Sequence, residues 1–365
     1  MEINFSLQRS ATGAGAYTVP LKARSRSKKR SSGTKFKSRK APFSLSTDAL
    51  QGPSQELYMY QPRWLNCYIT TNLLQFLIFR DTVECKRSGI MQKRIAVIND
   101  ISGFGRCSIS VSLPIISYLG VQCCPVPTSI FSNHTGFPHF FFDDYTDRMP
   151  EYIDHWKRLG LTFDGVATGF LGSARQIQIV KEFIREFGGE GTQIIIDPVM
   201  GDNGKLYSTY SEEMCREMKK LIAHADIITP NLTECCKLTD TAYKDAGWKK
   251  KELYEMAEKL SAQGPEKVVI TGIKQGEFIA NYIYEKNASE QRWIRTHKVG
   301  TERSGTGDVF ASIIAADAVN GVAFDRSVRK ASGFVKKCIL KSIELEIPKT
   351  DGVCFEEILH QLKRD

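Results

Sequence analysis

The sequence predicts an α/β fold in which a mainly parallel sheet is covered by helices on both faces. Three observations carry this prediction. Short apolar runs, often β-branched, recur from residue 93 onward and are closed by Gly, Pro, Asn or Asp. Amphipathic segments with helical spacing lie between several of these runs. The runs do not alternate with polar residues, which is typical of strands that are buried on both faces of a parallel sheet.

Six of these runs are the predicted parallel strands. They are RIAVIN (94–99), VQCCPVPT (121–128), FDGVATGF (163–170), TQIIIDP (192–198), ADIITPN (225–231) and KVVITG (267–272). Segments 278–286 and 291–299 alternate like paired antiparallel strands, and we expect them to extend one edge. Ligands of such sheets bind outside the carboxyl ends of the strands, so the polar residues that end the runs predict a cleft there.

Helices are predicted between and after the strands. Segment 174–188 has an apolar stripe at helical spacing and ends on glycine, and segment 211–225 begins with Ser211 as a capping residue. The stretch RSGTGDVFASIIAADAVNG (303–321) predicts a helix that begins near residues 306–308 and stops at Asn320–Gly321. Segments 328–346 and 355–365 are also expected to be helical.

The start of the helix at 306–308 has the properties of an anion site. Its first backbone amides have no partner within the helix, and they carry a partial positive charge. Gly305 and Gly307 flank Thr306, which lets a ligand approach the backbone closely. We therefore expect these three residues to hold a phosphoryl group during transfer.

Asp308 lies in the first turn of this predicted helix. A carboxylate at this position is able to accept the proton of a substrate hydroxyl that attacks phosphorus. The alternative is that Asp308 only complements the helix dipole, as acids in first turns commonly do.

Two more segments supply polar groups at the same sheet edge. In IIIDPVMGDNGKLY (194–207), Asp197 ends a strand and Asp202 follows in a turn, a pair that suits Mg²⁺ bridging phosphates. In ITPNLTE (228–234), Asn231 is a candidate for nucleotide hydrogen bonds and Glu234 for a water-mediated cation contact. The alternatives are turn-forming aspartates in the first segment and a capping box in the second.

Charge and cysteine content exclude other classes. The net charge of +9 comes from residues 1–40, which hold eleven Lys/Arg and one acid; the remainder holds 39 basic and 40 acidic residues. A nucleic-acid footprint is therefore not indicated in the body of the chain. The ten cysteines show no C-x-x-C spacing, which favours reduced thiols and a cytoplasmic protein. The sequence lacks the Walker loop of P-loop proteins and the glycine-rich loop of protein kinases. No G-x-G-x-x-G follows the first predicted strand, which disfavours dinucleotide binding.

Residues 1–90 are predicted to be a separate leader. Segment 22–40 is basic and serine-rich, too poor in apolar residues to form a core. The apolar stretch 64–79 is only sixteen residues long and contains polar residues, so it falls short of a membrane span. The leader is either an organelle transit segment or translated sequence without function ahead of a true start at Met91. The domain organisation is thus a disordered leader over 1–90 and one α/β domain over 91–365.

Seven motifs in this order resemble the ribokinase superfamily and, within it, the vitamin B6 branch of pyridoxal kinases of the pyridoxamine kinase type. The motifs are NDISGFGR (99–106), SNHTG (132–136), TGFLGS (168–173), DPVMGD (197–202), TPNLTE (229–234), VVITG (268–272) and GTGD (305–308). The resemblance covers 93–365 and implies a ribokinase-like three-layer sandwich. It implies an ATP-dependent kinase for the 5′-hydroxymethyl group of pyridoxal, pyridoxamine or pyridoxine, a homodimer, and no nucleic-acid or membrane partner.

The resemblance also assigns roles to single positions. Asp308 is the implied base, and the anion hole comprises Gly305, Thr306 and Gly307. The implied substrate contacts are Asn99 (often serine in the family), Thr128, Phe170 (in place of a common tyrosine) and Asp308. The implied ATP-binding residues are Asp197, Thr229, Asn231, Glu234 and Thr271. Mg²⁺ is assigned to Asp197, Asp202 and Glu234, with a monovalent cation as a further candidate.

Two other functions remain open at this stage. Hydroxymethylpyrimidine kinase of thiamine synthesis shares the fold and the GTGD base, although SNHTG lies where that branch usually carries Q-N-T. A non-catalytic nucleotide-binding relative is disfavoured because Asp308 and both flanking glycines are present.

Overall fold

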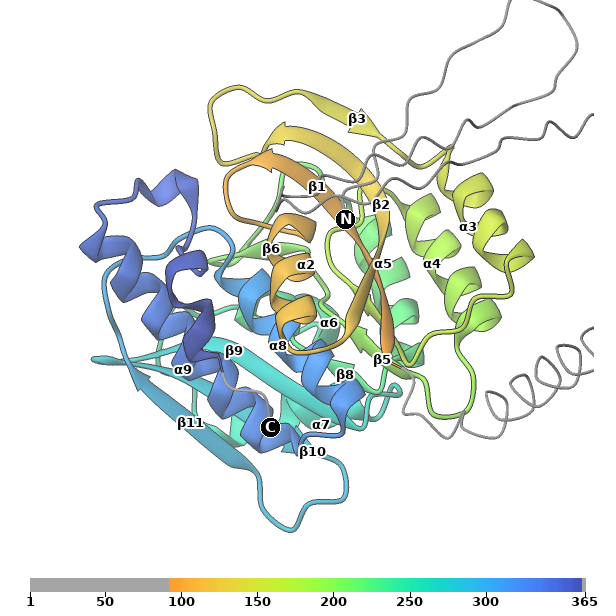
Figure 1. Ribbon diagram of the computed structural model, residues 1–365. Helices are drawn as coiled ribbons and strands as arrows, with labels where there is room; N and C mark the ends of the chain where they lie inside the picture. The colour runs from red at the N-terminus through yellow and green to blue at the C-terminus, as the bar shows by residue number, and fades with distance from the viewer. Residues whose placement is uncertain (1–91, 363–365) are drawn as a thin grey trace, which may run out of the picture. The chain divides into compact units, whose positions relative to one another are not determined.

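The computed structural model describes residues 92–362. They contain a nine-stranded sheet and a separate two-stranded hairpin (Figure 1). The strands of the large sheet are β1 (Arg94–Phe104), β2 (Gln122–Asn133), β3 (Phe142–Asp144), β4 (Gly165–Thr168), β5 (Gln193–Ile196), β8 (Ile227–Ile228), β9 (Lys267–Gln275), β10 (Phe278–Glu285) and β11 (Arg292–His297). The hairpin pairs β6 (Gly201–Asp202) with β7 (Lys205–Leu206).

The spatial order of the large sheet is β11-β10-β9-β8-β5-β4-β1-β2-β3. The strands from β9 to β2 are parallel, and each of them overlaps one of the six predicted runs. Strands β10 and β11 add an antiparallel edge, as predicted from their alternation. The short β3 closes the opposite edge in antiparallel fashion and has no counterpart among the predictions.

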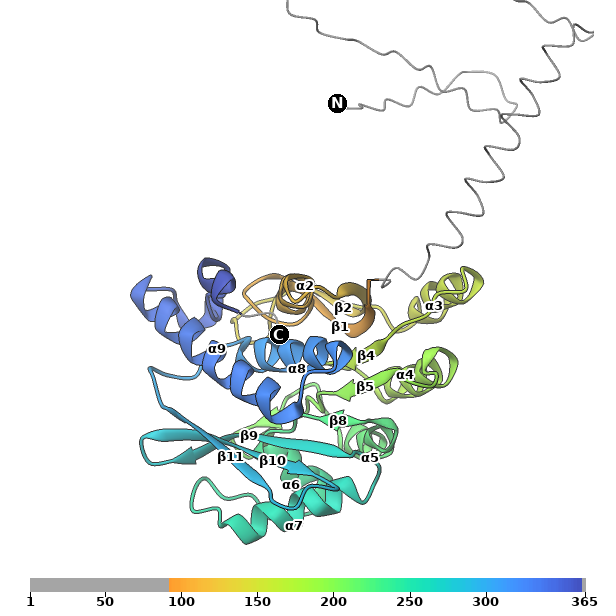
Figure 2. The same cartoon turned by 60° about the horizontal axis from the view of Figure 1, so that its bottom comes forward.

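Eight α-helices complete the described residues. They are α2 (Ile109–Tyr118), α3 (Met149–Arg158), α4 (Ala174–Phe187), α5 (Glu212–Leu221), α6 (Leu232–Thr239), α7 (Lys250–Ser261), α8 (Thr306–Asn320) and α9 (Phe324–Glu344). Helices α3 to α7 pack on one face of the sheet, and α2, α8 and α9 pack on the other (Figure 2). The predicted three-layer arrangement is confirmed.

Strand β1 shows why the parallel strands carry no polar alternation. Ile95 and Val97 face the layer of α2, α8 and α9, whereas Ala96 and Ile98 face the layer of α3 to α7. All four side chains are buried. Burying a Val or Ile side chain stabilises the fold by about 1.5–3 kcal/mol. The side chains on both faces of β1 therefore stabilise its central place in the sheet.

The chain reverses its direction of travel across the sheet at β1. The next strand along the chain, β2, lies on one side of β1, and the later β4 lies on the other. The pairing of β1 with β4 ends at Ile98–Thr168, and the pairing with β2 shifts register between Asn99 and Ile101. A crevice at such a switch point is the usual ligand site of open α/β sheets.

The predicted leader over 1–90, with its apolar stretch, lies outside the described residues. Within 92–362 the structure contains no helix that is long and apolar enough to cross a membrane.

Candidate functional site

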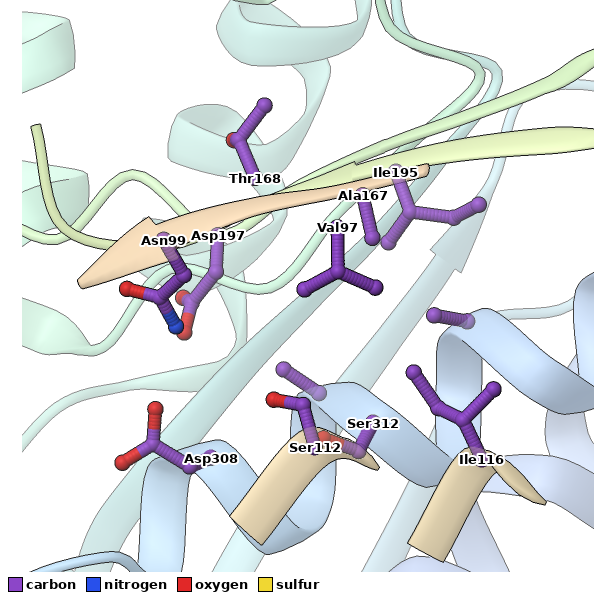
Figure 3. A pocket seen from close by; sticks show the side chains of 13 residues that line it. Val97, Asn99, Ser112, Ile116, Ala167, Thr168, Ile195, Asp197, Asp308 and Ser312 are labelled. Atoms are coloured by element: carbon purple, nitrogen blue, oxygen red, sulfur yellow. The ribbon is translucent and has the colours of Figure 1, made fainter. Parts of the chain in front are cut away.

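A small cavity lies at the switch point between β1 and β4 (Figure 3). Asn99 lies in β1 just past its last pair with β4, and Asp197 follows β5; both project toward Asp308 on α8, so the cavity brings three predicted site residues together. The enclosed volume is about 20 Å³, which is room for about one water molecule. A ligand larger than a water molecule would have to lie over its mouth. The remaining lining residues are Val97, Ser112, Ile116, Ala167, Thr168, Gly169, Ile195, Ala311, Ser312 and Ala315.

The N-terminus of α8 begins at Thr306, as predicted, and it has no side-chain cap. Gly305 is the N-cap residue with φ 80° and ψ −2°, a left-handed conformation that favours glycine. A Cβ at Gly307 would meet no atom within 4 Å, so this glycine faces open space. The first amides of the helix are consequently accessible to an anion.

Asp308 is partly exposed at the cavity. Burial raises the pKa of its carboxyl group, while the backbone amide of Ser108 and the side-chain amide of Asn99 oppose the rise by hydrogen bonding. A raised pKa makes the carboxylate a stronger proton acceptor than a carboxylate in water. The position and the basicity of Asp308 both suit a general base.

The side chain of Asn99 has a fixed orientation. Its Oδ1 accepts hydrogen bonds from the backbone amides of Asp100 (3.0 Å) and Phe170 (2.8 Å). A Cβ at Gly169 would lie 2.4 Å from Nδ2 of Asn99, so only glycine leaves room for this side chain. With Oδ1 occupied, the amide hydrogens on Nδ2 are directed to Asp308 and to the cavity.

Asp197 is a partly exposed acid directly after β5. Its Oδ1 accepts a hydrogen bond from the hydroxyl of Thr229 (3.0 Å). Burial and the neighbouring charge of Asp308 raise the pKa of Asp197 to about 7. Among residues 92–362 no basic side chain forms an ion pair with Asp197, and a positive charge close to this carboxylate would favour its ionised form.

Asn231 and Glu234 form the capping box of α6, so the second alternative for this segment is confirmed. Glu234 accepts hydrogen bonds from the backbone amides of Asn231 (2.8 Å) and Met200 (3.1 Å). Asn231 Nδ2 donates to the carbonyl of Gly201 (2.8 Å). Burial and the charge of Asp197 raise the pKa of Glu234 well above its usual value. Both side chains thus hold the β6–β7 hairpin and α6 against the sheet edge.

The remaining predicted nucleotide and cation residues lie along the same edge, outside the cavity lining. Thr271 forms a parallel bridge with Asn231, and its amide donates to the carbonyl of Pro230 (2.9 Å). The carboxylate of Asp202, in β6, accepts bonds from the backbone amide (2.7 Å) and side chain (3.3 Å) of Asn203.

The structure separates the roles of Thr128 and Phe170. Thr128 is fully buried, and its hydroxyl donates to the carbonyl of Phe170 (3.0 Å). Phe170 is partly exposed beside Asn99 and makes an edge contact with Phe131 at 6.1 Å between ring centroids. Thr128 therefore holds the backbone of Phe170, and of these two side chains only that of Phe170 is accessible.

Sequence reasoning missed two polar residues of this region, Asp100 and Tyr207, whereas Thr168 ends one of the runs that predicted the cleft. Asp100 is a buried acid whose pKa is affected by Asp308. Tyr207 lies within electrostatic reach of Asp197, Asp202, Glu234 and Asp308, and burial together with these acids raises its pKa. The buried hydroxyl of Thr168 lines the cavity without a hydrogen-bond partner. Asp100 lies in the motif NDISGFGR, and Tyr207 ends the segment IIIDPVMGDNGKLY. This position within site segments was the only sequence feature that could have identified them as site residues.

A thiol nucleophile is not indicated at the site. Cys107 is buried next to it, and burial with the charges of Asp308 and Asp100 raises the pKa of its thiol to about 12. No cluster of three or more His, Cys, Asp or Glu that could hold a metal by itself occurs in residues 92–362. A cation here would share its ligands with the substrate phosphates and water, which is how Mg²⁺ commonly binds.

The parallel sheet, the crevice at its switch point and the open helix start beside a buried acid define a ribokinase-like small-molecule kinase. The chain belongs to the phosphomethylpyrimidine kinase family, whose model matches residues 113–352.

Solved structures with this fold include two informative relatives. A Bacteroides thetaiotaomicron protein, provisionally classed as a phosphomethylpyrimidine kinase and crystallised with pyridoxal, is 40% identical, with a TM-score of 0.72 over 74% of this chain and 96% of that protein. Pyridoxal kinase from Lactobacillus plantarum is 25% identical, with a TM-score of 0.67 over 74% of this chain and 96% of that chain. Both likenesses confirm the predicted ribokinase-like fold.

Sequence relatives point to the same branch. The Arabidopsis thaliana pyridoxal kinase is 32% identical over 54% of this chain and 65% of its own length. The pyridoxine/pyridoxal/pyridoxamine kinase of Bordetella avium is 28% identical over 68% of this chain and 86% of its own length. The resemblance to the pyridoxal kinases that the motifs indicated is confirmed.

Proposed function

We propose that this chain transfers the γ-phosphoryl group of ATP to the 5′-hydroxymethyl group of pyridoxal, pyridoxamine or pyridoxine. One observation carries the proposal: Asp308, a partly exposed acid whose pKa is raised by its surroundings, lies in the first turn of an uncapped helix whose Gly307 faces open space. The acid and the anion-binding backbone are therefore one turn or less apart. The Bacteroides relative that crystallised with pyridoxal supports the substrate class.

In the proposed reaction Asp308 removes the proton of the attacking alcohol. The alcohol oxygen forms the new bond to the γ-phosphorus, the bond to the β-phosphate oxygen breaks, and ADP leaves. The backbone amides of Gly305, Thr306 and Gly307 stabilise the charge on the phosphoryl oxygens during transfer. This needs no covalent intermediate on the protein.

Asn99 and Phe170 are the proposed contacts of the pyridine ring. Asn99 Oδ1 is already occupied by two backbone amides, and Nδ2 carries two hydrogens, of which the bond to Asp308 uses only one. Nδ2 therefore suits a ring acceptor, such as the pyridine nitrogen. Phe170 offers an aromatic face or edge beside it. Thr128 contributes indirectly, through its bond to the Phe170 carbonyl.

ATP is proposed to lie along the sheet edge formed by Thr229, Asn231 and Thr271, with its phosphates pointing to α8. Asp197 would hold Mg²⁺ directly, and Asp202 and Glu234 would act through water, because the oxygens of Glu234 already cap α6. When bound, Mg²⁺ would neutralise charge on the phosphates. A monovalent cation at this edge is a further candidate.

Hydroxymethylpyrimidine kinase is the second candidate, because the matching family model is named for that activity. The thiamine biosynthetic bifunctional enzyme of Arabidopsis thaliana is also 26% identical, over 69% of this chain and 47% of its own length. The test is ATP consumption with pyridoxal, pyridoxamine, pyridoxine and hydroxymethylpyrimidine side by side. We expect the highest kcat/KM with a B6 vitamer, and a higher value with the pyrimidine would overturn this assignment.

We further propose that the protein is a cytoplasmic homodimer. The eight cysteines in residues 92–362 form no disulfide, which supports a reducing compartment. Deleting residues 1–90 is expected to leave turnover unchanged. Fluorescent fusions with and without these residues, together with light scattering of the purified protein, test compartment and oligomeric state.

A further inference from the structure

Gln176 is a fully buried polar side chain behind the segment that carries Phe170, and the reaction described above does not use it. It lies in the first turn of α4, three residues after the N-cap Ser173, and none of its surface is exposed. A glutamine at this position commonly bonds back to the amide of the N-cap serine and completes a capping box. Here its Oε1 instead accepts a hydrogen bond from the backbone amide of Gly172 (2.7 Å).

The Nε2 group of Gln176 reaches two further segments. It donates hydrogen bonds to the carbonyl of Thr128 in β2 (2.8 Å) and to the hydroxyl of Thr146, two residues after β3 (2.7 Å). The Thr146 oxygen is able to accept because its own hydrogen is donated to Asp144 of β3, whose carboxylate also lies 3.1 Å from Nε2. A side-chain amide both donates and accepts, so the polar atoms of this buried group are all paired.

Two of these bonds lead to Phe170. Gly172 follows Phe170 by two residues, and the hydroxyl of Thr128 donates to the Phe170 carbonyl (3.0 Å). The amide of Phe170 is held by Oδ1 of Asn99 (2.8 Å). Gln176 therefore holds the Phe170 segment directly at Gly172 and, through Thr128, at the Phe170 carbonyl.

The bond to Thr146 holds the antiparallel β2–β3 pair, whose aromatic rings meet Phe170. Phe131 of β2 lies 6.1 Å from Phe170 and 4.8 Å from Phe142 of β3, measured between ring centroids. Strands β2 and β3 run beside each other at the edge of the sheet (Figure 1). One side chain, Gln176, thus connects the two segments that carry these three rings.

We propose that Gln176 is a positioning residue that fixes Phe170 and its aromatic neighbours as one wall of the site for the pyridine ring. This inference rests on the proposed contact of Phe170 with the substrate. A wall whose rings are already ordered has less conformational entropy to lose when the ring binds. Because Gln176 is buried behind the wall, its loss acts on binding of the vitamer and leaves binding of ATP unchanged.

Gln176→Met is the principal variant. Methionine has about the volume of glutamine but makes none of its hydrogen bonds, so the melting temperature is expected to fall. At a temperature where the variant is folded, we expect the KM for pyridoxal to rise about tenfold, the effect of about one lost hydrogen bond. The KM for ATP should stay within about twofold.

Phe183→Leu is the matched control for lost stability. Phe183 lies about two turns further along the same face of α4, is 1% exposed, and packs against the rings of Phe163 and Phe187. The smaller side chain leaves a cavity, so the melting temperature falls here as well. The KM for pyridoxal should nevertheless stay within about twofold, because the bonds to the Phe170 segment are intact.

The path through Phe170 is tested with Phe170→Ala and with the double variant. If Gln176 acts through Phe170, Gln176→Met adds nothing once the ring is removed, and the double variant has the same KM for pyridoxal as Phe170→Ala. Thr128→Val removes only the hydrogen bond to the Phe170 carbonyl, and it is expected to raise the KM for pyridoxal in the same direction. This variant decides the proposal if Gln176→Met does not fold.

The outcomes separate the positioning role from the proposed function. The positioning role is overturned by an unchanged KM for pyridoxal in Gln176→Met or Thr128→Val, by an equal rise in Phe183→Leu, or by increases that multiply in the double variant. Each of these results leaves the proposed function intact. Failure of the unmodified chain to phosphorylate any B6 vitamer would overturn the proposed function itself.

Discussion

The backbone carbonyl of Arg106 lies directly against Gly305, the residue before α8. A Cβ added to Gly305 would be 2.0 Å from this oxygen, whereas a Cβ on Gly307 would meet nothing within 4 Å. Arg106 is in turn held by the carbonyl of Asp351 and the carboxylate of Glu356. The two glycines of the GTGD motif therefore serve different purposes: one permits close packing, and the other keeps the anion site open.

Gly307→Ala is accordingly expected to separate activity from stability. At an exposed position in a helix, alanine is more stabilising than glycine by about 1 kcal/mol. The melting temperature of this variant should therefore stay equal or rise. The new methyl group would enter the space proposed for the phosphoryl group, and turnover should fall. Gly305→Ala is the comparison, with both stability and activity lost because its Cβ clashes with backbone. Calorimetry and steady-state kinetics on both variants check this; unchanged turnover in Gly307→Ala would contradict the proposed anion site.

Asp308→Asn is expected to bind ATP normally and to lose roughly 10²–10⁴ in turnover, the usual contribution of a general base. The amide retains the shape of the side chain and its acceptor oxygen for the Ser108 amide but cannot take the proton. Equilibrium nucleotide binding and single-turnover kinetics measure the two effects separately. Near-normal turnover would remove Asp308 from the chemistry and would leave it as a residue that complements the helix dipole.

The sequence predicted the fold more completely than the site. Apolar runs and glycine stops are local signals, so the six parallel strands and the start of α8 at Thr306 were within reach. The short strand β3 was missed because three residues give no periodicity. Asp308, Asp197 and Asn99 were identified as site residues, and the structure brings them to one cavity.

Contacts between distant segments explain what the sequence could not predict. The hydroxyl of Thr128 donates a hydrogen bond to the carbonyl of Phe170, 42 positions later in the chain. No local sequence pattern predicts such a contact. Asp100 lies inside a motif but drew no prediction, because its burial and its bond to the Ser102 hydroxyl are visible only in the fold. Local motifs show which residues end strands, whereas the tertiary contacts decide which of their polar groups remain free.

The stability of the protein is expected to depend on pH through Asp100. Burial raises its pKa to about 6 in the fold, against about 3.8 for an aspartate in water. At a pH between these two pKa values, Asp100 is ionised in the unfolded chain and protonated in the folded chain. The contribution of Asp100 to folding stability is therefore fully present below about pH 4 and is lost as the pH rises toward 7. A shift of about two units corresponds to roughly 3 kcal/mol. Asn cannot ionise, so Asp100→Asn should gain about this amount relative to the unmodified chain between pH 4 and 7. Urea unfolding across this range measures the difference, and parallel curves would contradict the prediction.

The ion pair between Asp317 and Lys330 joins the helix that carries Asp308 to its neighbour α9. Asp317 is only 1% exposed, and Lys330 Nζ lies 2.9 Å from its Oδ1. Removing the cation leaves a buried carboxylate with less compensation, so Lys330→Met is expected to cost about 3 kcal/mol of unfolding free energy. The control is Lys157→Met, because the pair of Lys157 with Glu186 is solvent-exposed and such pairs contribute about 0–1 kcal/mol. Denaturant titrations compare the two, and equal losses would show that burial of Asp317 has no special consequence. At temperatures where Lys330→Met is folded, turnover should be preserved, because the pair supports α8 from the side away from the cavity lining.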